Sequence, residues 1–502
     1  MRSILWTVLL AAAPAWGQSV EAEEFVLDNG MKFLLYPRAE QPHNVSAGWV
    51  AHVGSVNERP GITGISHFFE HMMFKGTRTI GTSDAEQDAS FRDRQEAVRG
   101  QLRALQIEQN YPRYLAGEIA DPWHASNDTA AMKELRAQLD QLITDHKSVI
   151  VKDEFDQVYT QLGGSRMNAF TSNDLTFYFI TVPSNKLEHW AWLESDRLAD
   201  SVFREFYSER DVVHEERRKR TESTPTGVYD EQFQAMFWES SPYSWPVVGW
   251  PTDLNSYTMA QAREYYDTYY RPNNLTGVIV GDFDAEAVKP LLTRYFGRLE
   301  AGEPPPPVVT LEMPQLAEKR MDAACECTPQ VNVRHHAPPY EHADMASLEV
   351  LASLLNGRTG RLYRNLVEGS GVAAEAYASY RPLKYGGYID IGAEVKGDAT
   401  PADLEREILK VVETLKTEPV PERELQKVKN QVLADSYRRL EDNYSLMVQL
   451  GFYEALGDWR YLNTEGQRMA AVTAEDIQKA AQTWLSPQER AVATYVRKEG
   501  EE

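Results

Sequence analysis

The chain has 502 residues, enough for about two to four domains by length alone. Its formal net charge is −23 at pH 7, which argues against a nucleic-acid partner because nucleic-acid-binding surfaces are basic. The charge is compatible with basic peptide ligands, although solvation of the surface accounts for most of it.

The first 17 residues have the pattern of a cleavable secretory signal peptide. Arg2 precedes an apolar run from Ile4 to Trp16, and Ala15-Trp16-Gly17 matches a cleavage site with small residues at both ends. The run is too short to span a bilayer, and no later stretch is long and apolar enough to do so. We therefore expect an exported chain, either secreted or, in a Gram-negative bacterium, periplasmic.

Strands are predicted in two pairs within the first half of the chain. Glu24–Tyr36 and Val45–Val53 form the first pair, and the strand pattern returns at Arg166–Thr171 and Leu175–Val182. Between the pairs lie a short apolar segment around His67 and a long charged segment.

The apolar segment contains His67, Glu70 and His71 in the order His-x-x-Glu-His. On a helix, residues four apart project from one face, so the two imidazoles lie one turn apart. The other positions are apolar nearly all round, which indicates a buried helix. Two buried histidines and a carboxylate need partners, and a metal ion supplies them. The order is that of an inverted zinc-peptidase motif, in which Glu70 accepts a proton from water.

The charged segment, from about residue 82 to residue 149, has the period of two helices. Apolar residues recur along each predicted helix, at Val98, Leu102 and Leu105 in the first and at Leu135, Leu139 and Leu142 in the second. Prolines and a polar run separate the helices, so we expect a helical hairpin inserted into the first half. Its role is open between a surface ornament and a part in substrate capture.

A second acidic motif lies downstream. A charged run of this kind is usually a solvated helix face. The spacing i, i+3, i+4, i+7 nevertheless puts four residues on the only apolar stripe: Glu209, Val212, Val213 and Glu216. Glu215 points about a third of a turn away. We therefore expect Glu216 to be the third metal ligand and Glu209 to support a histidine or the water.

The second half of the chain repeats part of the first with an offset of 215 residues. Thr258 matches Thr473 and Pro272 matches Pro487, since 473 − 258 and 487 − 272 both equal 215. Each copy is predicted as a helix with a threonine N-cap, a proline break and a strand, the two strands being Leu275–Val280 and Ala491–Val496.

The repeat predicts an α+β fold with two homologous, α/β-sandwich-like halves, each a sheet covered by helices. Residues 18–300 are expected to form the metal-binding half and residues 309–502 the second half. The proline run within residues 301–308 predicts a stiff, extended linker between them.

Cys325 and Cys327 are the two cysteines of the chain. One residue separates them on a predicted strand, so a disulfide between them would be strained, and we expect both to be free. His335 and His336 could join them in a second metal site.

Three motifs together resemble the insulinase/pitrilysin family of zinc metallopeptidases, in the short two-domain form related to mitochondrial processing peptidase. They are Gly64–Met72, Glu209–Val213 with Glu216, and Gly163–Thr171, and the resemblance covers most of the chain after the signal peptide. His71 and Glu216 are farther apart than in most relatives, and the inserted hairpin accounts for the excess.

The resemblance implies one zinc ion per chain and the role of each site residue. The zinc ligands are His67, His71 and Glu216, the general base is Glu70, and the supporting carboxylate is Glu209. The family pattern further implies that an extended substrate pairs with the strand through Asn168, Ala169 and Phe170.

One departure from the family pattern concerns the second half. Relatives often carry an Arg and a Tyr there that hold the scissile carbonyl region from across the chamber, but Val367 and Ala374 stand in these places. Tyr377 and Tyr380 lie close by, and nothing in the sequence indicates that they replace the pair. We therefore expect a homologous partner subunit to supply the Arg and the Tyr.

The expected function is that of a zinc-dependent endopeptidase acting on peptides or unfolded polypeptide segments, as the catalytic subunit of a heterodimer. The alternative is an inactive peptide-binding or scaffold homologue. Inactive relatives have usually lost metal ligands, whereas all five site positions are present here. The zinc content of the purified chain separates the two functions.

Overall fold

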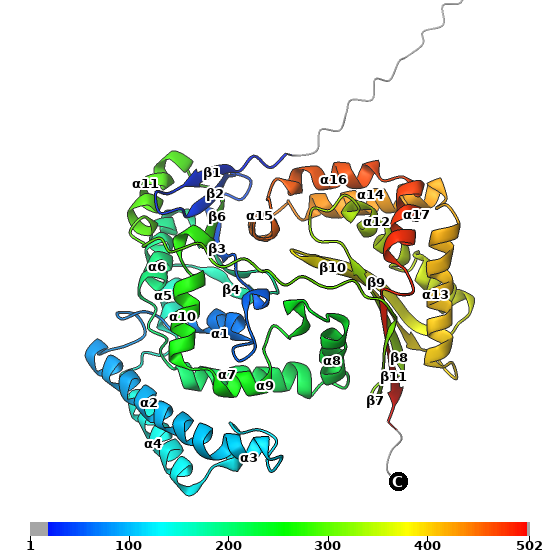
Figure 1. Cartoon of the computed structure of the whole chain (residues 1–502). Coiled ribbons are helices and arrows are strands. Elements are labelled where there is room, and N and C mark those ends of the chain that lie inside the picture. The colour runs from blue at the N-terminus through cyan, green and yellow to red at the C-terminus, as the bar shows by residue number, and fades with distance from the viewer. Residues whose placement is uncertain (1–18, 499–502) are drawn as a thin grey trace, which may run out of the picture.

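A computed structural model describes residues 19–498, and the predicted signal peptide, residues 1–17, lies outside this range. Two sheets, each covered by helices, stand side by side (Figure 1). This arrangement confirms the predicted fold class. Within residues 19–498, no helix is both long and apolar enough to cross a membrane.

The first sheet has six strands in the order β1-β2-β6-β3-β5-β4. Only β2 and β6 pair in parallel. The predicted strand Glu24–Tyr36 is two strands, because the turn residues Asp28, Asn29 and Gly30 divide it, with Gly30 at a φ of 86°. The strands are β1 (Glu23–Val26), β2 (Lys32–Pro37), β3 (Asn44–Ala51), β4 (Ser165–Thr171), β5 (Thr176–Pro183) and β6 (Leu275–Gly281).

The second sheet has five strands in the order β7-β11-β8-β10-β9, and only β7 and β11 pair in parallel. Without β1, the first sheet has the same order and the same single parallel pair, as a repeat requires. The strands are β7 (Lys319–Cys325), β8 (Gln330–Ala337), β9 (Ala373–Leu383), β10 (Gly386–Val395) and β11 (Arg490–Arg497).

Helices cover both sheets, and the matched pair α10 and α17 begins in the same way in each half. The hydroxyls of Thr258 and Thr473 accept the backbone N–H of Gln261 and Asp476, at 3.3 and 3.1 Å, so both predicted N-caps are present. The helices of the first half are α1 (Ile65–Met72), α2 (Ala85–Leu105), α3 (Tyr111–Leu115), α4 (Ala130–His146), α5 (Glu154–Gln161), α6 (Leu187–Asp200), α7 (Phe206–Arg217), α8 (Gly227–Phe237), α9 (Pro251–Ser256), α10 (Met259–Tyr269) and α11 (Ala285–Phe296). Those of the second half are α12 (Met345–Leu355), α13 (Pro401–Thr417), α14 (Glu422–Arg438), α15 (Asn443–Leu456), α16 (Tyr461–Ala471) and α17 (Ala474–Trp484).

The two halves exchange one helix each. Helix α15 of the second half packs on the first sheet, where Met447 and Leu450 join a buried cluster with Phe177 of β5. Helix α8 of the first half packs on the second sheet, where Phe233 and Phe237 join a buried cluster with Ala493 of β11. Because each half covers apolar surface of the other, the halves depend on one another for burial.

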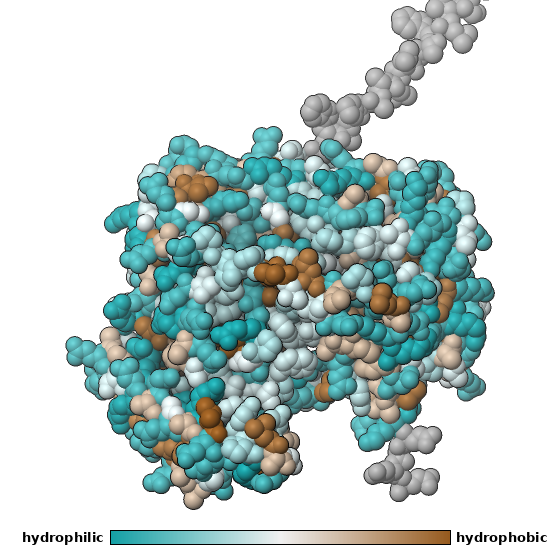
Figure 2. Space-filling view, viewed as in Figure 1, coloured by the Kyte–Doolittle hydropathy of each residue, from teal (hydrophilic) through white to brown (hydrophobic). Residues whose placement is uncertain are grey.

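The inserted hairpin is attached to the first half at its base. Asp88 of α2, His146 of α4 and Arg204 of the body are buried together, with Asp88 oxygens 2.8 Å from His146 Nε2 and 2.6 Å from Arg204 Nε. The tip is different, because Ile107 and Leu115 are exposed. Figure 2 shows hydrophobic residues at the lower end of the molecule, where Figure 1 places the hairpin.

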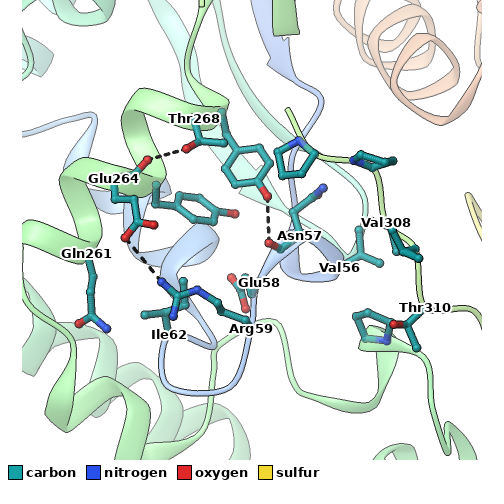
Figure 3. Close-up of a pocket in the computed structure, with 16 residues that line it drawn as sticks. Val56, Asn57, Glu58, Arg59, Ile62, Gln261, Glu264, Thr268, Val308 and Thr310 are labelled. Carbon is teal, nitrogen blue, oxygen red and sulfur yellow. Dashed lines mark hydrogen bonds and ion pairs between the residues drawn. The ribbon is translucent and has the colours of Figure 1, made fainter. Parts of the chain in front are cut away.

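The linker between the halves lies against the first half. The end of the predicted linker and the two residues after it, Pro306–Thr310, line a pocket of about 380 Å³ together with the loop Val56–Ile62 and one face of α10 (Figure 3). Arg59 and Glu264 form an ion pair across this pocket, at 3.5 Å.

The expectation that both cysteines are free is wrong, because Cys325 and Cys327 form a disulfide with a Cα–Cα distance of 5.3 Å. Strand β7 ends at Cys325 and the chain then bends at Glu326 and Cys327, so the two residues do not share a regular strand. The alternative of a second metal site fails as well. The ring of His336 stacks on Phe237 at 3.9 Å, and no cluster of cysteine and histidine ligands forms within residues 19–498.

Candidate functional site

Helix α1 carries the His-x-x-Glu-His motif at the centre of the first half. The apolar residues Phe68, Phe69 and Met72 are fully buried, as the all-round apolar pattern predicts. The carboxylate of Glu58 caps the helix, accepting the backbone N–H groups of Gly64 at 2.7 Å and Ser66 at 2.8 Å. These contacts fix the start of the helix and therefore the direction of both histidines.

Gly64 allows this helix to begin where it does. Its φ of 86° is in the left-handed region, and a Cβ there would lie 2.3 Å from the carbonyl oxygen of Val248. Only glycine fits so close to the neighbouring loop, which lies beside the candidate site.

Helix α7 lies alongside α1 and presents its carboxylates to the histidines. Glu209 and Val213 are buried, and Glu216 is largely buried, so three of the four residues predicted on one stripe face inward. The prediction is wrong for the fourth residue, because Val212 is 49% exposed. The buried face of α7 is centred on Val213 and Arg210, and Val212 lies at the edge of that face.

His67, His71 and Glu216 form a group of three potential metal ligands, whose ligand atoms lie within 4.8 Å of one another. The Nε2 atoms of His67 and His71 are 3.5 and 3.2 Å from the two carboxylate oxygens of Glu216. A tetrahedral zinc site with bonds of about 2.0–2.1 Å has ligand atoms about 3.3 Å apart, so the distances fit zinc. Two imidazoles and one carboxylate also match the donor set of catalytic zinc sites, which keep a fourth position open.

The charges of this group are strongly coupled. The hydrogen bond from His67 lowers the pKa of Glu216 to about 2, against the effect of burial. Burial acts to lower the pKa of His71, but the hydrogen bond and the charge of Glu209 raise it by more than burial lowers it. The net shift is therefore upward. An ionised carboxylate beside two imidazoles is a set of donors suited to a metal cation.

Glu209 stands behind His71, as expected for a supporting carboxylate. His71 Nδ1 donates to Glu209 Oε1 at 2.9 Å, which leaves Nε2 directed at Glu216. Lys75, which the sequence reasoning missed, contacts the other oxygen of Glu209 at 2.5 Å. Burial acts to raise the pKa of Glu209, but these two partners lower it, so Glu209 is ionised.

Glu70 points toward the edge strand β4. The hydroxyl of Thr171 donates to Glu70 Oε2 at 2.7 Å, a contact that the sequence reasoning also missed. Thr171 follows Asn168, Ala169 and Phe170 on β4, which is the last strand of the first sheet and, within residues 19–498, pairs only with β5. The predicted substrate strand therefore has a free edge and adjoins the predicted base.

A pocket of about 500 Å³ joins these parts. All its lining residues come from the first half: His67, Glu70, His71, Asn168, Ala169, Phe170, Thr171, Glu216, Arg217, Arg220, Thr221, Val247 and Val248. Arg220 was missed because it belongs to a charged run that appears solvated in the sequence, although its position four residues after Glu216 is a helical signal.

Residues of the second half do not line this pocket within the described part of the chain. Val367 is half-buried in its own half, and Ala374 is exposed at the start of the edge strand β9. Tyr380 has a buried hydroxyl, and the ring of Tyr377 lies against Gly392 of the neighbouring strand. Val367 and Ala374 therefore do not line the pocket that contains the metal-ligand group.

Comparison with known proteins agrees with this architecture. A family model described as "Insulinase (Peptidase family M16)" matches residues 34–89, and one described as "Peptidase M16 inactive domain" matches residues 256–432. "Zinc protease PqqE" of Helicobacter pylori is 23% identical over 504 residues, covering 97% of this chain and 95% of the relative. "Uncharacterized zinc protease YmxG" of Bacillus subtilis is 24% identical over 465 residues, covering 91% and 93%.

Solved structures show the same fold. A protease from Helicobacter pylori aligns with a TM-score of 0.77 at 22% identity, over 96% of this chain and 100% of the other. The first half of the periplasmic protease PqqL from Escherichia coli aligns with a TM-score of 0.69 at 16% identity, over 96% and 93%. Matches to family models in both halves, relatives of the same length and a shared two-sheet fold lead to one conclusion: this chain is a member of the insulinase/pitrilysin (M16) family of peptidases.

Proposed function

We propose that this chain is a zinc-dependent endopeptidase that cleaves peptides or unfolded polypeptide segments. His67, His71 and Glu216 would hold one zinc ion, and Glu70 would be the general base. The observation that carries the proposal is the convergence of these four side chains in one pocket beside a free strand edge. The names of the relatives, zinc proteases, support it.

The residues of the chain divide the work of hydrolysis. Zinc held by His67, His71 and Glu216 would supply Lewis-acid polarisation of the scissile carbonyl and of a water molecule. Glu70 takes the proton of the attacking water and returns it to the leaving amine, while Thr171 holds the carboxylate in place. Glu209, paired with Lys75, fixes the ring orientation of His71.

The free edge of β4 sets the form of the substrate. An extended peptide would add to Asn168, Ala169 and Phe170 by backbone hydrogen bonds, which brings its scissile bond beside Glu70. A folded protein cannot offer an extended strand to this edge, so peptides and unfolded segments are the expected substrates.

The remaining donors are expected from a second protein. A developing oxyanion needs positioned donors, and the second half of this chain has Val367 and Ala374 at the places where relatives carry Arg and Tyr. We therefore assign the missing pair to a homologous partner subunit. Export to the periplasm or beyond is part of the proposal, supported by the signal-like first 17 residues and by the description of PqqL as periplasmic.

Point variants test the proposal through two separate measurements, zinc content and peptide cleavage. Glu70→Gln should retain about one zinc per chain and lose cleavage, because it removes the base and keeps the ligands. His71→Ala and Glu216→Ala should lose the zinc itself. Glu215→Ala is the matched control, because Glu215 is the neighbouring residue of α7 and its side chain is more exposed, at 39% against 17% for Glu216.

Two results would count against the proposal. Normal zinc content in Glu216→Ala together with loss of zinc in Glu215→Ala would refute the choice of ligand. A wild-type chain without zinc would favour the inactive peptide-binding or scaffold homologue, the class to which the wording "inactive domain" points for the second half.

A further inference from the structure

Two arginines line the candidate active-site pocket, one of them buried and the other exposed. The side chain of Arg217 is 4% exposed, and its guanidinium donates to both carboxylate oxygens of Glu231 at 2.6 Å and to the carbonyl of Gly249 at 3.0 Å. The side chain of Arg220 is 77% exposed, and Glu216 is its one ion-pair partner among the described residues. Arg220 is therefore the cation of the pocket that has donors to spare.

The backbone holds Arg220 at the rim of the pocket. Helix α7 continues directly into a π-helical turn, Arg218–Glu222, closed by a hydrogen bond from the Ser223 N–H to the Arg218 carbonyl at 2.8 Å. Such wide turns occur frequently at functional sites. The turn is tightly packed, since a Cβ on Gly227 would lie 2.2 Å from the Thr221 carbonyl oxygen. The position of Arg220 relative to the ligand helix is thus fixed by ordered backbone.

The present partner of Arg220 has another role in the proposed function. The oxygens of Glu216 face His67 and His71, and with a metal ion in this group the negative charge of Glu216 is largely compensated. Glu216 then attracts the guanidinium of Arg220 less strongly. The guanidinium is free to bind an anionic group of the substrate.

The other residues that line the pocket indicate what that anion is. Asn168, Ala169 and Phe170 of β4 line the same pocket as Arg220, so a peptide bound along the strand would enter the pocket that Arg220 borders. Peptides carry carboxylates on aspartate and glutamate side chains, and a guanidinium binds a carboxylate through two parallel hydrogen bonds.

We propose that Arg220 binds an acidic side chain of the substrate next to the scissile bond, so that acidic peptide segments are the preferred substrates. This inference rests on the proposed function, because it assigns peptide binding to the same pocket. It also explains how a chain with a net charge of −23 can accept acidic substrates, since the selecting charge is local and positive.

The test measures binding separately from cleavage. Peptides that differ only by Asp, Asn or Lys at each of the two positions on either side of the scissile bond are titrated, by fluorescence anisotropy, against the zinc-loaded Glu70→Gln chain. At one position at least, the Asp peptide should bind about tenfold more tightly than the Asn peptide, the usual effect of a hydrogen bond to a charged group. Adding Arg220→Gln should abolish the difference, and adding Arg220→Glu should reverse it in favour of Lys.

Arg218→Gln is the matched control, because Arg218 is exposed in the same turn and pairs with Glu215 instead of a site residue. It should leave the Asp preference unchanged. An equal affinity for Asp and Asn peptides at every position, or a preference that survives Arg220→Gln, would overturn the inference. So would a loss of zinc in Arg220→Gln with the preference retained, since Arg220 would then only position Glu216.

The two proposals fail in different ways. If the wild-type chain cleaves zinc-dependently but shows no acidic preference, the inference about Arg220 is wrong and the proposed function stands. If acidic peptides bind through Arg220 but the wild-type chain does not cleave them in any assembly, the inference stands and the proposed catalytic role is wrong.

Discussion

Thr171 and Lys75 each contact a carboxylate on which the proposed mechanism depends. The sequence predicted Glu70 and Glu209 themselves, because helical spacing fixes which side chains share a face. It did not predict their partners, since Thr171 is 101 residues from Glu70 and Lys75 is 134 residues from Glu209 along the chain. One signal was available for Thr171: it continues the predicted substrate strand by a single residue.

Thr171→Val should slow catalysis without removing the metal. Valine keeps the β-branched shape but cannot donate to Glu70 Oε2, so the carboxylate loses a partner at 2.7 Å. We expect kcat to fall about tenfold, with KM and zinc content little changed. Steady-state kinetics and metal analysis check this, with Thr181→Val as control, because the Thr181 hydroxyl pairs with Ser46 away from the site. An unchanged kcat would show that Glu70 needs no such donor.

The inserted hairpin shows how an element predicted correctly from its period can hold a contact that the period does not reveal. Leu102, Leu139 and Leu142 are buried, as the apolar positions indicated. Asp88 and His146, however, belong to charged runs that sequence reasoning assigns to solvent. They are buried around the guanidinium of Arg204, which also donates to the carbonyls of Thr77 and Ile80. One guanidinium therefore joins the hairpin to the segment that follows α1.

Asp88→Asn should therefore destabilise the first half far more than removal of the hairpin tip. Burial acts to raise the pKa of Asp88, but hydrogen bonds from His146 and Arg204 hold it well below its usual range, so the buried guanidinium faces a charged partner. Removing one charge of a buried pair costs about 3–5 kcal/mol. Since a chain of this size has an unfolding entropy of about 1 kcal/mol/K, the melting temperature should fall by about 3–5 °C.

The control for this prediction is a chain in which residues 107–129 are replaced by a short Gly/Ser loop that joins α2 to α4. It lacks the exposed Ile107 and Leu115 but keeps Asp88 and His146. Its melting temperature and zinc content should stay close to those of the wild type. Equal destabilisation by both changes, measured by thermal unfolding, would show that the tip belongs to the core and that the polar cluster is not the anchor.

At the scale of the molecule, the offset of 215 residues predicted two halves of the same topology, and the matching strand orders agree. The exchange of α8 and α15 could not be predicted in the same way. The periodicity of an amphipathic helix shows that it has an apolar face, but not which sheet that face covers. The disulfide was mispredicted for a related reason, because the bend at Glu326 that brings Cys325 and Cys327 together is not visible as a turn signal.

The exchange bears on assembly, because it ties each metal half firmly to its own second half. Met447 and Leu450 of α15 are fully buried on the first sheet, so this second half stays with its own metal half. Val367 and Ala374 remain at the positions of the Arg and Tyr in every copy of this chain, and a homodimer would bring together two incomplete sites.

The chain purified alone should bind zinc and cleave peptides poorly, and addition of its homologous partner should restore cleavage. Loss of one positioned donor typically lowers kcat about 10²–10³-fold, so the gain in kcat/KM should reach at least this range. The partner is sought as a neighbouring gene product with Arg and Tyr at the two positions and without His-x-x-Glu-His. A partner variant lacking that Arg is the control and should give little gain.

The double variant Val367→Arg, Ala374→Tyr should recover part of the activity without a partner. Full activity of the unmodified chain as a homodimer would contradict the prediction, and Tyr377→Phe would then test the one nearby tyrosine that is exposed.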